Sequence, residues 1–254
     1  MNTSNLPVIS RGAILVVGRD DRKGYLYAVD QAQDRFGIIK KREQINPRAY
    51  AYLMSHSHEH ICRVYDFWEA DDGYWIFEEH VRGRSLREVA AERSFSPEEA
   101  VKIILEVLEG LQFLHSASPA IIHRDLTLSN IMVDDLDRVR IVDFGAARVY
   151  RRGRSQDTCS IGTPGYAAPE QFGFAQTDAR TDIYAAGILM RELGLDRGKY
   201  RHVVRRATRL APERRYPNAR LMAAEIRMLS LRFRNSIHGR GSGLFLQRSG
   251  RAII

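Results

Sequence analysis

The sequence predicts an α+β fold in two lobes, a small antiparallel β-rich lobe followed by a larger, mainly helical one. Residues 13–81 hold short β-branched or aromatic runs separated by Asp, Gly and Arg turns, which is typical of strands. Beyond residue 85 the apolar residues recur at helical spacing instead. This change of period places the seam between the lobes near Val81–Ser85.

The N-terminal part is expected to form five strands and one short helix. In the helical segment, Asn46 can cap the first turn and Pro47 suits the first helical position. Ile45 can then pack onto Tyr50 and fix the entry of the chain into the helix. The strands are predicted at residues 13–17, 24–29, 35–41, 62–70 and 74–81.

The longest predicted helix opens the C-terminal part. Ser96 can cap it, Pro97 follows, and Glu99 completes a capping box. Its apolar positions at helical spacing are Val101, Ile104, Leu105, Leu108, Leu111 and Leu114. Further helices are predicted at about 182–193, 200–210 and 218–231, and a basic Gly/Arg-rich tail at 234–254 is expected to be loosely held.

Composition narrows the class of protein. The 254 residues, 44% of them hydrophobic, suffice for a full core. No apolar run approaches the ~20 residues that cross a bilayer, and the N-terminus lacks a signal-peptide pattern. We therefore expect no membrane span and a cytoplasmic location. Two cysteines, Cys62 and Cys159, are too few for a disulfide scaffold.

The net charge of +8 comes mainly from arginine, because the five lysines leave 34 of the 39 basic residues as Arg. This balance favours anionic partners such as nucleotides, although a solvated Arg-rich surface is the simpler explanation of the charge. Basic runs such as YRRGR carry no ladder of stacking aromatics. A nucleic-acid partner is therefore not expected.

Three polar motifs follow one another along the chain: HRDLTLSN at 123–130, DFG at 143–145 and APE at 168–170. In this order and spacing they resemble the signature of Ser/Thr protein kinases, most closely the eukaryotic-like kinases of bacteria. The resemblance is specific from about residue 74 to 217. It implies a two-lobed protein kinase-like fold over 8–233, with an N-lobe at about 8–81 and a reduced C-lobe at about 82–233.

The resemblance implies an enzyme, a serine/threonine protein kinase that transfers the γ-phosphate of Mg²⁺–ATP to Ser or Thr hydroxyls and autophosphorylates. Asp125 would accept or orient the proton of the substrate hydroxyl. Asn130 and Asp143 would hold Mg²⁺, for which Mn²⁺ could substitute. Lys40 would contact the α- and β-phosphates of ATP.

Further nucleotide contacts are implied around these groups. Gly18 and Gly24 would form the phosphate-binding turn, and the backbone of Glu79 and Val81 would meet the adenine. Thr127 stands where Ser/Thr kinases usually carry a lysine near the transferred phosphate. Its hydroxyl can donate a hydrogen bond but brings no positive charge.

Three residues are expected to support the site without touching the nucleotide. Glu170 and Arg215 would form a buried ion pair that ties the segment after DFG to the large lobe. Asp182 would anchor the backbone of the catalytic loop.

Regulation is expected in the segment between DFG and APE. A phosphate there would have the Arg124 guanidinium as a partner. Plain loop polarity is the alternative explanation for these hydroxyls. Thr163 is interpreted as forming the site rather than regulating it. The candidate phosphorylation sites are Thr158, Ser160 and Ser155.

The pattern departs from the family in the turn GRDDRKG, which lacks the middle glycine. Asp20 and Asp21 at its tip would repel phosphates, and an ordinary charged hairpin is the alternative reading of this turn. In addition, only 33 positions separate Asp182 from Arg215, where the family inserts another helix that helps dock protein substrates.

A second departure concerns the partner of Lys40. The helix that should present a glutamate to it has no acid, and the expected position falls near Ala49. Glu43 is expected to lie still on the strand of Lys40. We hypothesise that Glu78 replaces the missing partner; alternatively, it points to solvent or to an arginine.

Two other function classes remain open at this stage. The altered turn and the missing helix acid favour a pseudokinase, a binding scaffold that holds ATP or a partner without transfer. A small-molecule phosphotransferase is a further alternative, against which the GTPGYAAPE segment argues because it builds a floor for a peptide. The sequence assigns no particular substrate protein and no oligomeric state.

Overall fold

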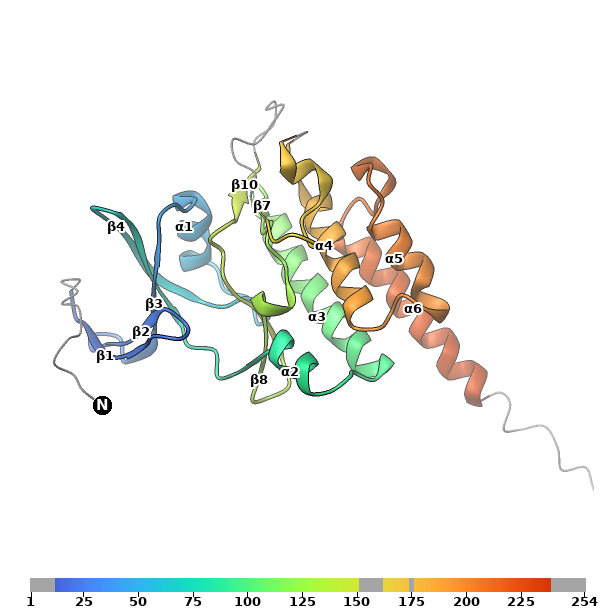
Figure 1. Ribbon diagram of the computed structural model, residues 1–254, viewed down its shortest axis with the longest axis horizontal. Coiled ribbons are helices and arrows are strands. Elements are labelled where there is room, and N and C mark those ends of the chain that lie inside the picture. The colour runs from blue at the N-terminus through green and yellow to red at the C-terminus, as the bar shows by residue number, and fades with distance from the viewer. Residues whose placement is uncertain (1–11, 151–161, 174–175, 239–254) are drawn as a thin grey trace, which may run out of the picture.

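The computed structural model describes residues 12–150, 162–173 and 176–238. Figure 1 shows a β-sheet with one helix at one end of the molecule and the larger set of helices at the other. The predicted α+β architecture in two lobes is confirmed. The chain passes between the lobes through residues 80–82.

The N-lobe is a five-stranded antiparallel sheet in the order β1-β2-β3-β5-β4. All five strands arise from the β-branched and aromatic runs, and each lies within a few residues of its predicted bounds. They are β1 (Ile14–Asp20), β2 (Tyr25–Asp30), β3 (Arg35–Arg42), β4 (Val64–Ala70) and β5 (Gly73–Glu79).

The single N-lobe helix, α1 (Pro47–Ser55), begins as its sequence predicts. The Asn46 side chain accepts a hydrogen bond from the Ala49 amide, and Pro47 takes the first helical position. Ile45 and Tyr50 are both buried in the main core, in agreement with the predicted packing between them. The helix is therefore fixed to the sheet by its first turn.

The C-lobe is built around α3 (Pro97–Ser116), whose capping box of Ser96 and Glu99 forms as predicted. Its apolar face lies in the main hydrophobic core, which also takes in buried residues of the other large helices. Those helices are α4 (Ala179–Glu192), α5 (Arg201–Ala207) and α6 (Ala219–His238).

Short strands and turns carry the polar motifs across the face of this lobe that meets the N-lobe. A three-stranded sheet has the order β6-β8-β9, and β7 pairs with β10. These strands are β6 (Gly83–Ser85), β7 (Ile121–Ile122), β8 (Ile131–Asp134), β9 (Val139–Ile141) and β10 (Arg148–Val149). The 3₁₀ turns are η1 (Leu128–Asn130), η2 (Pro169–Phe172), η3 (Gly198–Tyr200) and η4 (Pro212–Arg214).

Helix α2 (Leu86–Glu92) was not among the predicted helices. Its signal is present in the sequence, because Ser85 and Glu88 form a complete capping box. The other difference is the end of α6, which continues to His238, whereas the apolar pattern placed its end near residue 231. The expected start of the tail at residue 234 therefore falls inside this helix.

The large lobe is reduced as expected, since only the turn η3 lies between α4 and α5. Within the described ranges, no helix is both long enough and apolar enough to cross a membrane.

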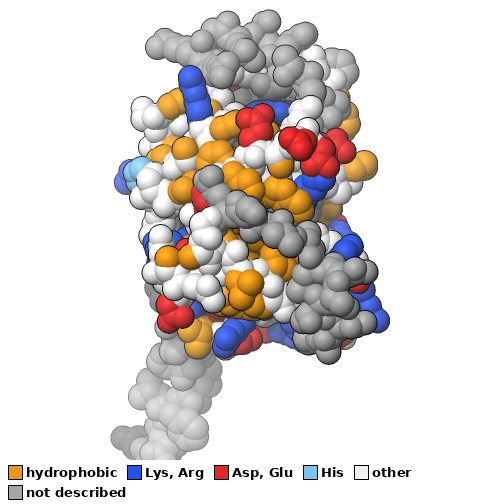
Figure 2. All heavy atoms as spheres, turned by 90° about the vertical axis from the view of Figure 1, so that its left-hand side faces the viewer, with side chains coloured by type: hydrophobic (Ala, Val, Ile, Leu, Met, Phe, Trp, Pro, Cys, Tyr) orange, Lys and Arg blue, Asp and Glu red, His pale blue; other side chains and the backbone are white. Residues whose placement is uncertain are grey.

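Figure 2 views the molecule from its N-lobe end and shows hydrophobic side chains gathered over this face. A second, smaller apolar cluster lies in the N-lobe, with Leu26, Ala28, Ile39 and Phe77 buried at its centre.

Candidate active site

A cavity of about 310 Å³ lies between the two lobes. The N-lobe contributes residues of β2 and β3, among them Lys40, and the C-lobe contributes Asn130 and Asp143. Glu79 and Val81 line it at the passage between the lobes, as predicted for the adenine end. Gly24 lines it too, whereas Gly18 lies inside β1 opposite Tyr27 and is not among the lining residues.

The β8–β9 hairpin brings the two predicted metal ligands together. Ile131 pairs with Ile141 in register, so the residue before β8 lies beside the residues that follow β9. The Val142 amide donates to the Asn130 carbonyl at 2.9 Å, which places Asp143 next to Asn130 along the edge of the cleft. Asn130 and Asp143, which have twelve residues between them in the sequence, are thus adjacent in the fold.

Asp125 is held from two sides. The Asn130 side-chain amide donates to the Asp125 carboxylate at 3.0 Å and to its backbone carbonyl at 2.8 Å. On the other carboxylate oxygen, the Thr163 hydroxyl donates at 2.7 Å and the Thr163 amide at 3.2 Å. Thr163 therefore forms part of the site, as its sequence position indicated. Thr127, which belongs to the same loop as Asp125, is also buried.

Asp182 anchors the loop that carries the motif HRDLTLSN, residues 123–130. Its carboxylate accepts hydrogen bonds from the amides of His123 and Arg124, both at 2.9 Å, and from the His115 ring at 2.8 Å. Arg124 has a φ of 69°, a left-handed conformation that costs free energy in a residue with a side chain. The fully buried Asp182 thus holds a strained backbone in place, in accord with its predicted structural role.

Burial raises the pKa of Asp182, but the hydrogen bond and charge of His115, the charge of His123 and the Arg124 amide outweigh it. The net pKa of this carboxyl is lower than its ordinary value. The carboxylate is therefore ionised in the folded protein at neutral pH, which keeps all its acceptor positions available.

Lys40 has Glu78 as its partner. The Lys40 Nζ and the Glu78 Oε1 are 2.5 Å apart, and the two side chains are only 16% and 3% exposed. Burial lowers the pKa of Lys40, but Glu78 and then Asp143 outweigh it, so the net pKa is raised. The hypothesis that Glu78 partners Lys40 is confirmed at the level of contact, and the solvent-facing alternative is wrong.

The register of the sheet explains this pairing. Ile38 lies opposite Glu78 and Lys40 opposite Ile76, so Lys40 and Glu78 are diagonal neighbours on one face. Ala49, where the helix acid was expected, is fully buried in the core. Glu43 lies just past the end of β3 and is exposed, rather than on the strand as expected.

Asp143 contacts Arg42, which was not among the site residues predicted from the sequence. The Arg42 Nη2 donates to the Asp143 Oδ2 at 2.6 Å, and the Gly145 amide donates to the other carboxylate oxygen at 3.2 Å. Burial raises the pKa of Asp143, but Arg42 and then Lys40 outweigh it, and the net pKa is lowered. The available signal was spacing, because Arg42 lies two residues after Lys40 and strand side chains alternate between faces.

The turn between β1 and β2 is closed by its own side chain. The Asp20 carboxylate accepts the amides of Arg22 at 3.1 Å and Lys23 at 3.0 Å, and Asp21 pairs with Arg19. These amides are the donors that a phosphate would use. The alternative of a charged hairpin therefore describes this turn, although Gly24 still ends it with a φ of 67°.

Glu79, at the predicted adenine end of the cleft, is held by several contacts. Its amide donates to the Arg63 carbonyl at 2.8 Å, and its side chain pairs with Arg140 and accepts the Arg63 amide. The Glu79 carbonyl accepts the thiol of buried Cys62, with 3.5 Å between sulfur and oxygen. Because a thiol is a weak donor, this carbonyl is suited to accept a stronger hydrogen bond from a base.

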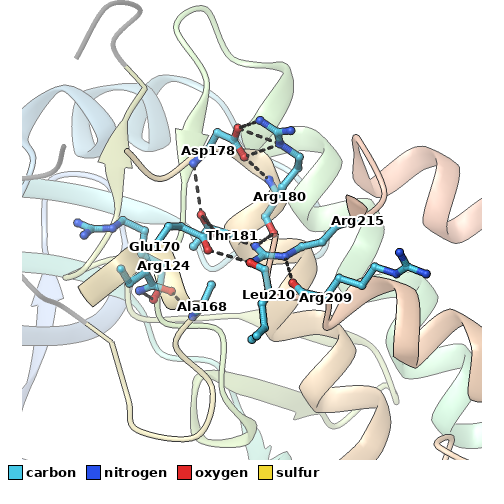
Figure 3. Close-up of polar contacts among 10 residues, drawn as sticks. Arg124, Ala168, Glu170, Asp178, Arg180, Thr181, Arg209, Leu210 and Arg215 are labelled. Carbon is cyan, nitrogen blue, oxygen red and sulfur yellow. Dashed lines mark hydrogen bonds and ion pairs between the residues drawn. The ribbon is translucent and has the colours of Figure 1, made fainter. Parts of the chain in front are cut away.

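The predicted ion pair of Glu170 and Arg215 is present and buried (Figure 3). Arg215 donates twice to Glu170, at 2.7 and 2.9 Å, and to the backbone carbonyls of Arg180, Leu210 and Arg209. All five guanidinium N–H groups thus have acceptors. This network ties the APE motif to α4 and to the turn before α6.

The candidate phosphorylation sites Thr158, Ser160 and Ser155 lie outside the described residues. Arg124, their predicted partner, is almost completely buried in the C-lobe, and its carbonyl accepts the Gln171 side chain at 2.7 Å. A contact between Arg124 and a phosphate therefore remains a prediction.

The donor chemistry of the cleft fits a magnesium ion. Because the Asn130 amide nitrogen is committed to Asp125, its side-chain oxygen is the atom left for a cation. With the Asp143 carboxylate it forms a set of hard oxygen ligands. No cluster of three or more His, Cys, Asp or Glu side chains suited to a metal is found among the residues that the structure describes. A magnesium ion here would therefore complete its shell with nucleotide phosphates and water.

The fold and the site together define the family. The protein kinase domain matches residues 12–219 of the sequence, which is most of the chain. The chain belongs to the protein kinase domain family.

Relatives among the curated proteins are bacterial. The chain is 44% identical over 145 residues to the probable serine/threonine-protein kinase PknB of Corynebacterium glutamicum, across 54% of this chain and 22% of that protein. It is 33% identical over 202 residues to a probable serine/threonine-protein kinase of Streptomyces coelicolor, across 74% and 29%. To the serine/threonine-protein kinase PrkC of Bacillus subtilis it is 33% identical over 138 residues, across 54% and 21%.

These similarities bear out the resemblance to the eukaryotic-like Ser/Thr kinases of bacteria. The chain spans less than a third of the length of each of these three relatives.

Proposed function

We propose that this protein is a serine/threonine protein kinase that transfers the γ-phosphate of Mg²⁺–ATP to Ser or Thr hydroxyls, its own included. One observation carries the proposal: Asn130 and Asp143 line the cleft, and Asp125 is held beside Asn130 by hydrogen bonds from Asn130 and Thr163. A scaffold that only holds a partner has no physical need for that arrangement.

The chemistry asks for positioning and for neutralisation of spreading negative charge. The substrate hydroxyl oxygen bonds to the γ-phosphorus while the bond from that phosphorus to the β–γ bridging oxygen breaks, and ADP leaves with those electrons. Asp125 accepts or orients the hydroxyl proton through its carboxylate. Lys40 reaches the α- and β-phosphates. Asn130 and Asp143 would hold a magnesium ion, which would supply neutralisation of the phosphate charge.

A protein substrate is favoured over a small molecule. Residues 163–170 lead from the Thr163 contact with Asp125 to Glu170, which Arg215 fixes to the large lobe. This anchored segment offers backbone beside the catalytic acid along which an extended peptide can lie. We propose Mg²⁺ as the physiological ion, with Mn²⁺ able to replace it, and the cytoplasm as the compartment where ATP and Mg²⁺ are supplied.

The test is phosphate transfer by the purified chain. With Mg²⁺ and γ-labelled ATP, we expect label on Ser or Thr of the protein and of added Ser/Thr peptides. Asp143→Asn should abolish it, whereas Asp135→Asn, which removes the same charge from an exposed turn, should not. Nucleotide binding without phosphate transfer would instead favour a pseudokinase. Phosphate transfer only to small molecules would favour a small-molecule phosphotransferase.

A further inference from the structure

Arg42 lines the cleft and contacts Asp143, one of the two proposed metal ligands. We propose that Arg42 is a resident cation of the metal site: its guanidinium holds Asp143 while the site is empty and competes with the divalent ion for that carboxylate. Arg42 thereby sets the metal concentration at which the cleft fills. The inference rests on the proposed function, because it concerns the same metal site.

The position of Arg42 is determined by the backbone. Arg42 and Lys40 lie two residues apart on β3 and thus point to the same face of the sheet, the one that faces the C-lobe. The guanidinium donates to the Lys41 carbonyl at 3.1 Å through Nη1 and to Asp143 at 2.6 Å through Nη2. One terminal nitrogen of the guanidinium is thus bound to the backbone of β3 while the other holds Asp143.

Gly145 provides the space for this contact. A Cβ added there would lie 3.1 Å from the Arg42 Nε and 3.2 Å from the Asp143 Oδ1. Either distance is tighter than ordinary van der Waals contact, so a side chain at 145 would require the pair to shift by a few tenths of an ångström. The small residue after the DFG phenylalanine therefore accommodates the arginine as well as the turn.

Charge pairing explains why Arg42 is available to Asp143. Lys40, the other cation on this face, is engaged by the nearly buried Glu78. Thr127 adds no positive charge where a lysine is usual. Arg42 is therefore the cation that forms an ion pair with Asp143. Both side chains are partly exposed, 33% for Arg42 and 29% for Asp143.

Competition follows from the state of the Asp143 carboxylate. One oxygen accepts the guanidinium and the other accepts the Gly145 amide. A cation that binds Asp143 must therefore displace one of these donors or share a carboxylate oxygen with it. If Arg42 stays in place, its positive charge repels the incoming cation. A part-exposed charge-assisted bond of this kind corresponds to roughly fivefold in a binding constant.

The chain supplies a matched control in the adjacent residue. Lys41 points to the opposite face of β3, where it pairs with Asp72 and lies 5.6 Å above the Trp75 ring. Lys41→Gln removes the same charge from the same strand without touching the cleft.

The experiment measures metal affinity directly. Mn²⁺ is titrated into the protein saturated with ADP and followed by electron paramagnetic resonance, for wild type, Arg42→Gln, Arg42→Lys and Lys41→Gln. We expect the Kd for Mn²⁺ to fall about fivefold in Arg42→Gln, to fall less in Arg42→Lys, and to stay unchanged in Lys41→Gln. Thermal unfolding checks that each variant is folded.

An unchanged or weaker Mn²⁺ affinity in folded Arg42→Gln would overturn the inference and leave the proposed function intact. If Arg42→Gln does not fold, Arg42→Lys decides, since an affinity equal to that of wild type there would also contradict competition. Failure of the wild-type protein to bind Mn²⁺ with ADP would remove the metal site itself, and the proposed function with it.

Discussion

Glu78 and Lys40 are diagonal neighbours on two antiparallel strands, with 2.5 Å between the carboxylate oxygen and the ammonium nitrogen. The acid that pairs with Lys40 therefore comes from the sheet itself, at the end of β5, and not from helix α1. A pairing within one sheet does not depend on where α1 lies. The lysine can be in place whenever the N-lobe is folded.

Glu78→Gln should weaken nucleotide binding. The amide keeps the shape but leaves a nearly buried ammonium without its counter-charge, which disfavours the position that Lys40 holds. We expect ADP affinity to fall about tenfold, measured by isothermal titration calorimetry. Glu43→Gln, an exposed position just past β3, removes the same charge and should leave affinity unchanged. Equal affinities in the two variants would contradict the role of Glu78.

Arg215→Lys should destabilise the large lobe although it conserves charge. Lysine has three donors and no planar fork, so it cannot reproduce the five hydrogen bonds that Arg215 makes to Glu170 and three carbonyls. We expect a loss of about 3 kcal/mol in the free energy of unfolding, from urea denaturation. The neighbouring Arg214→Lys on the exposed surface is the control, and a similar loss there would show that the network is not responsible.

Thr163→Val should reduce turnover with little effect on the KM for ATP. Valine is close to threonine in shape but removes the hydroxyl that orients Asp125 at 2.7 Å. A hydrogen bond to a charged group is worth about 1.5–3 kcal/mol, so we expect kcat to fall roughly tenfold or more. Thr163→Ser restores the hydroxyl and should recover most of the rate. A Ser variant as slow as the Val variant would assign Thr163 a packing role only.

Asp182 should contribute to acid sensitivity. Its pKa in the folded protein is below the ordinary 3.8, so the unfolded chain takes up the proton first as pH falls. The stabilisation is therefore fully present above about pH 5 and is lost as pH drops below about 4 toward the depressed value. Asp182→Asn should be less stable at pH 7 and should show a shallower loss of Tm between pH 5 and 3. A parallel pH dependence in both proteins would contradict this assignment.

Strands and helices were predictable because their signals are local. The β-branched runs gave all five N-lobe strands, and the Asn46 and Ser96 caps marked the starts of α1 and α3. The turn at Asp20–Gly24 was harder, because whether its carboxylate closes the turn or repels a phosphate depends on side-chain geometry. Helix α2 was missed despite its capping box, since its seven residues are too few for a periodic pattern.

The motif residues Asp125, Asn130 and Asp143 were identified by order and spacing alone. Their meeting in space needs the β8–β9 register, and their orientation needs Thr163, thirty-eight positions from Asp125. Spacing along one chain cannot report either contact, because both depend on which strands pair and how the segment after DFG folds back.

The sequence by itself determined the two-lobed α+β architecture and singled out Asp125, its amide neighbour Asn130 and the two buried ion-pair residues Glu170 and Arg215. Tertiary structure alone decided which charge each cation meets: Glu78 for Lys40 and Asp143 for Arg42. The physical reason is that secondary structure follows from local spacing and capping. Ion pairing follows instead from the distance between side chains, which only strand register and lobe packing set.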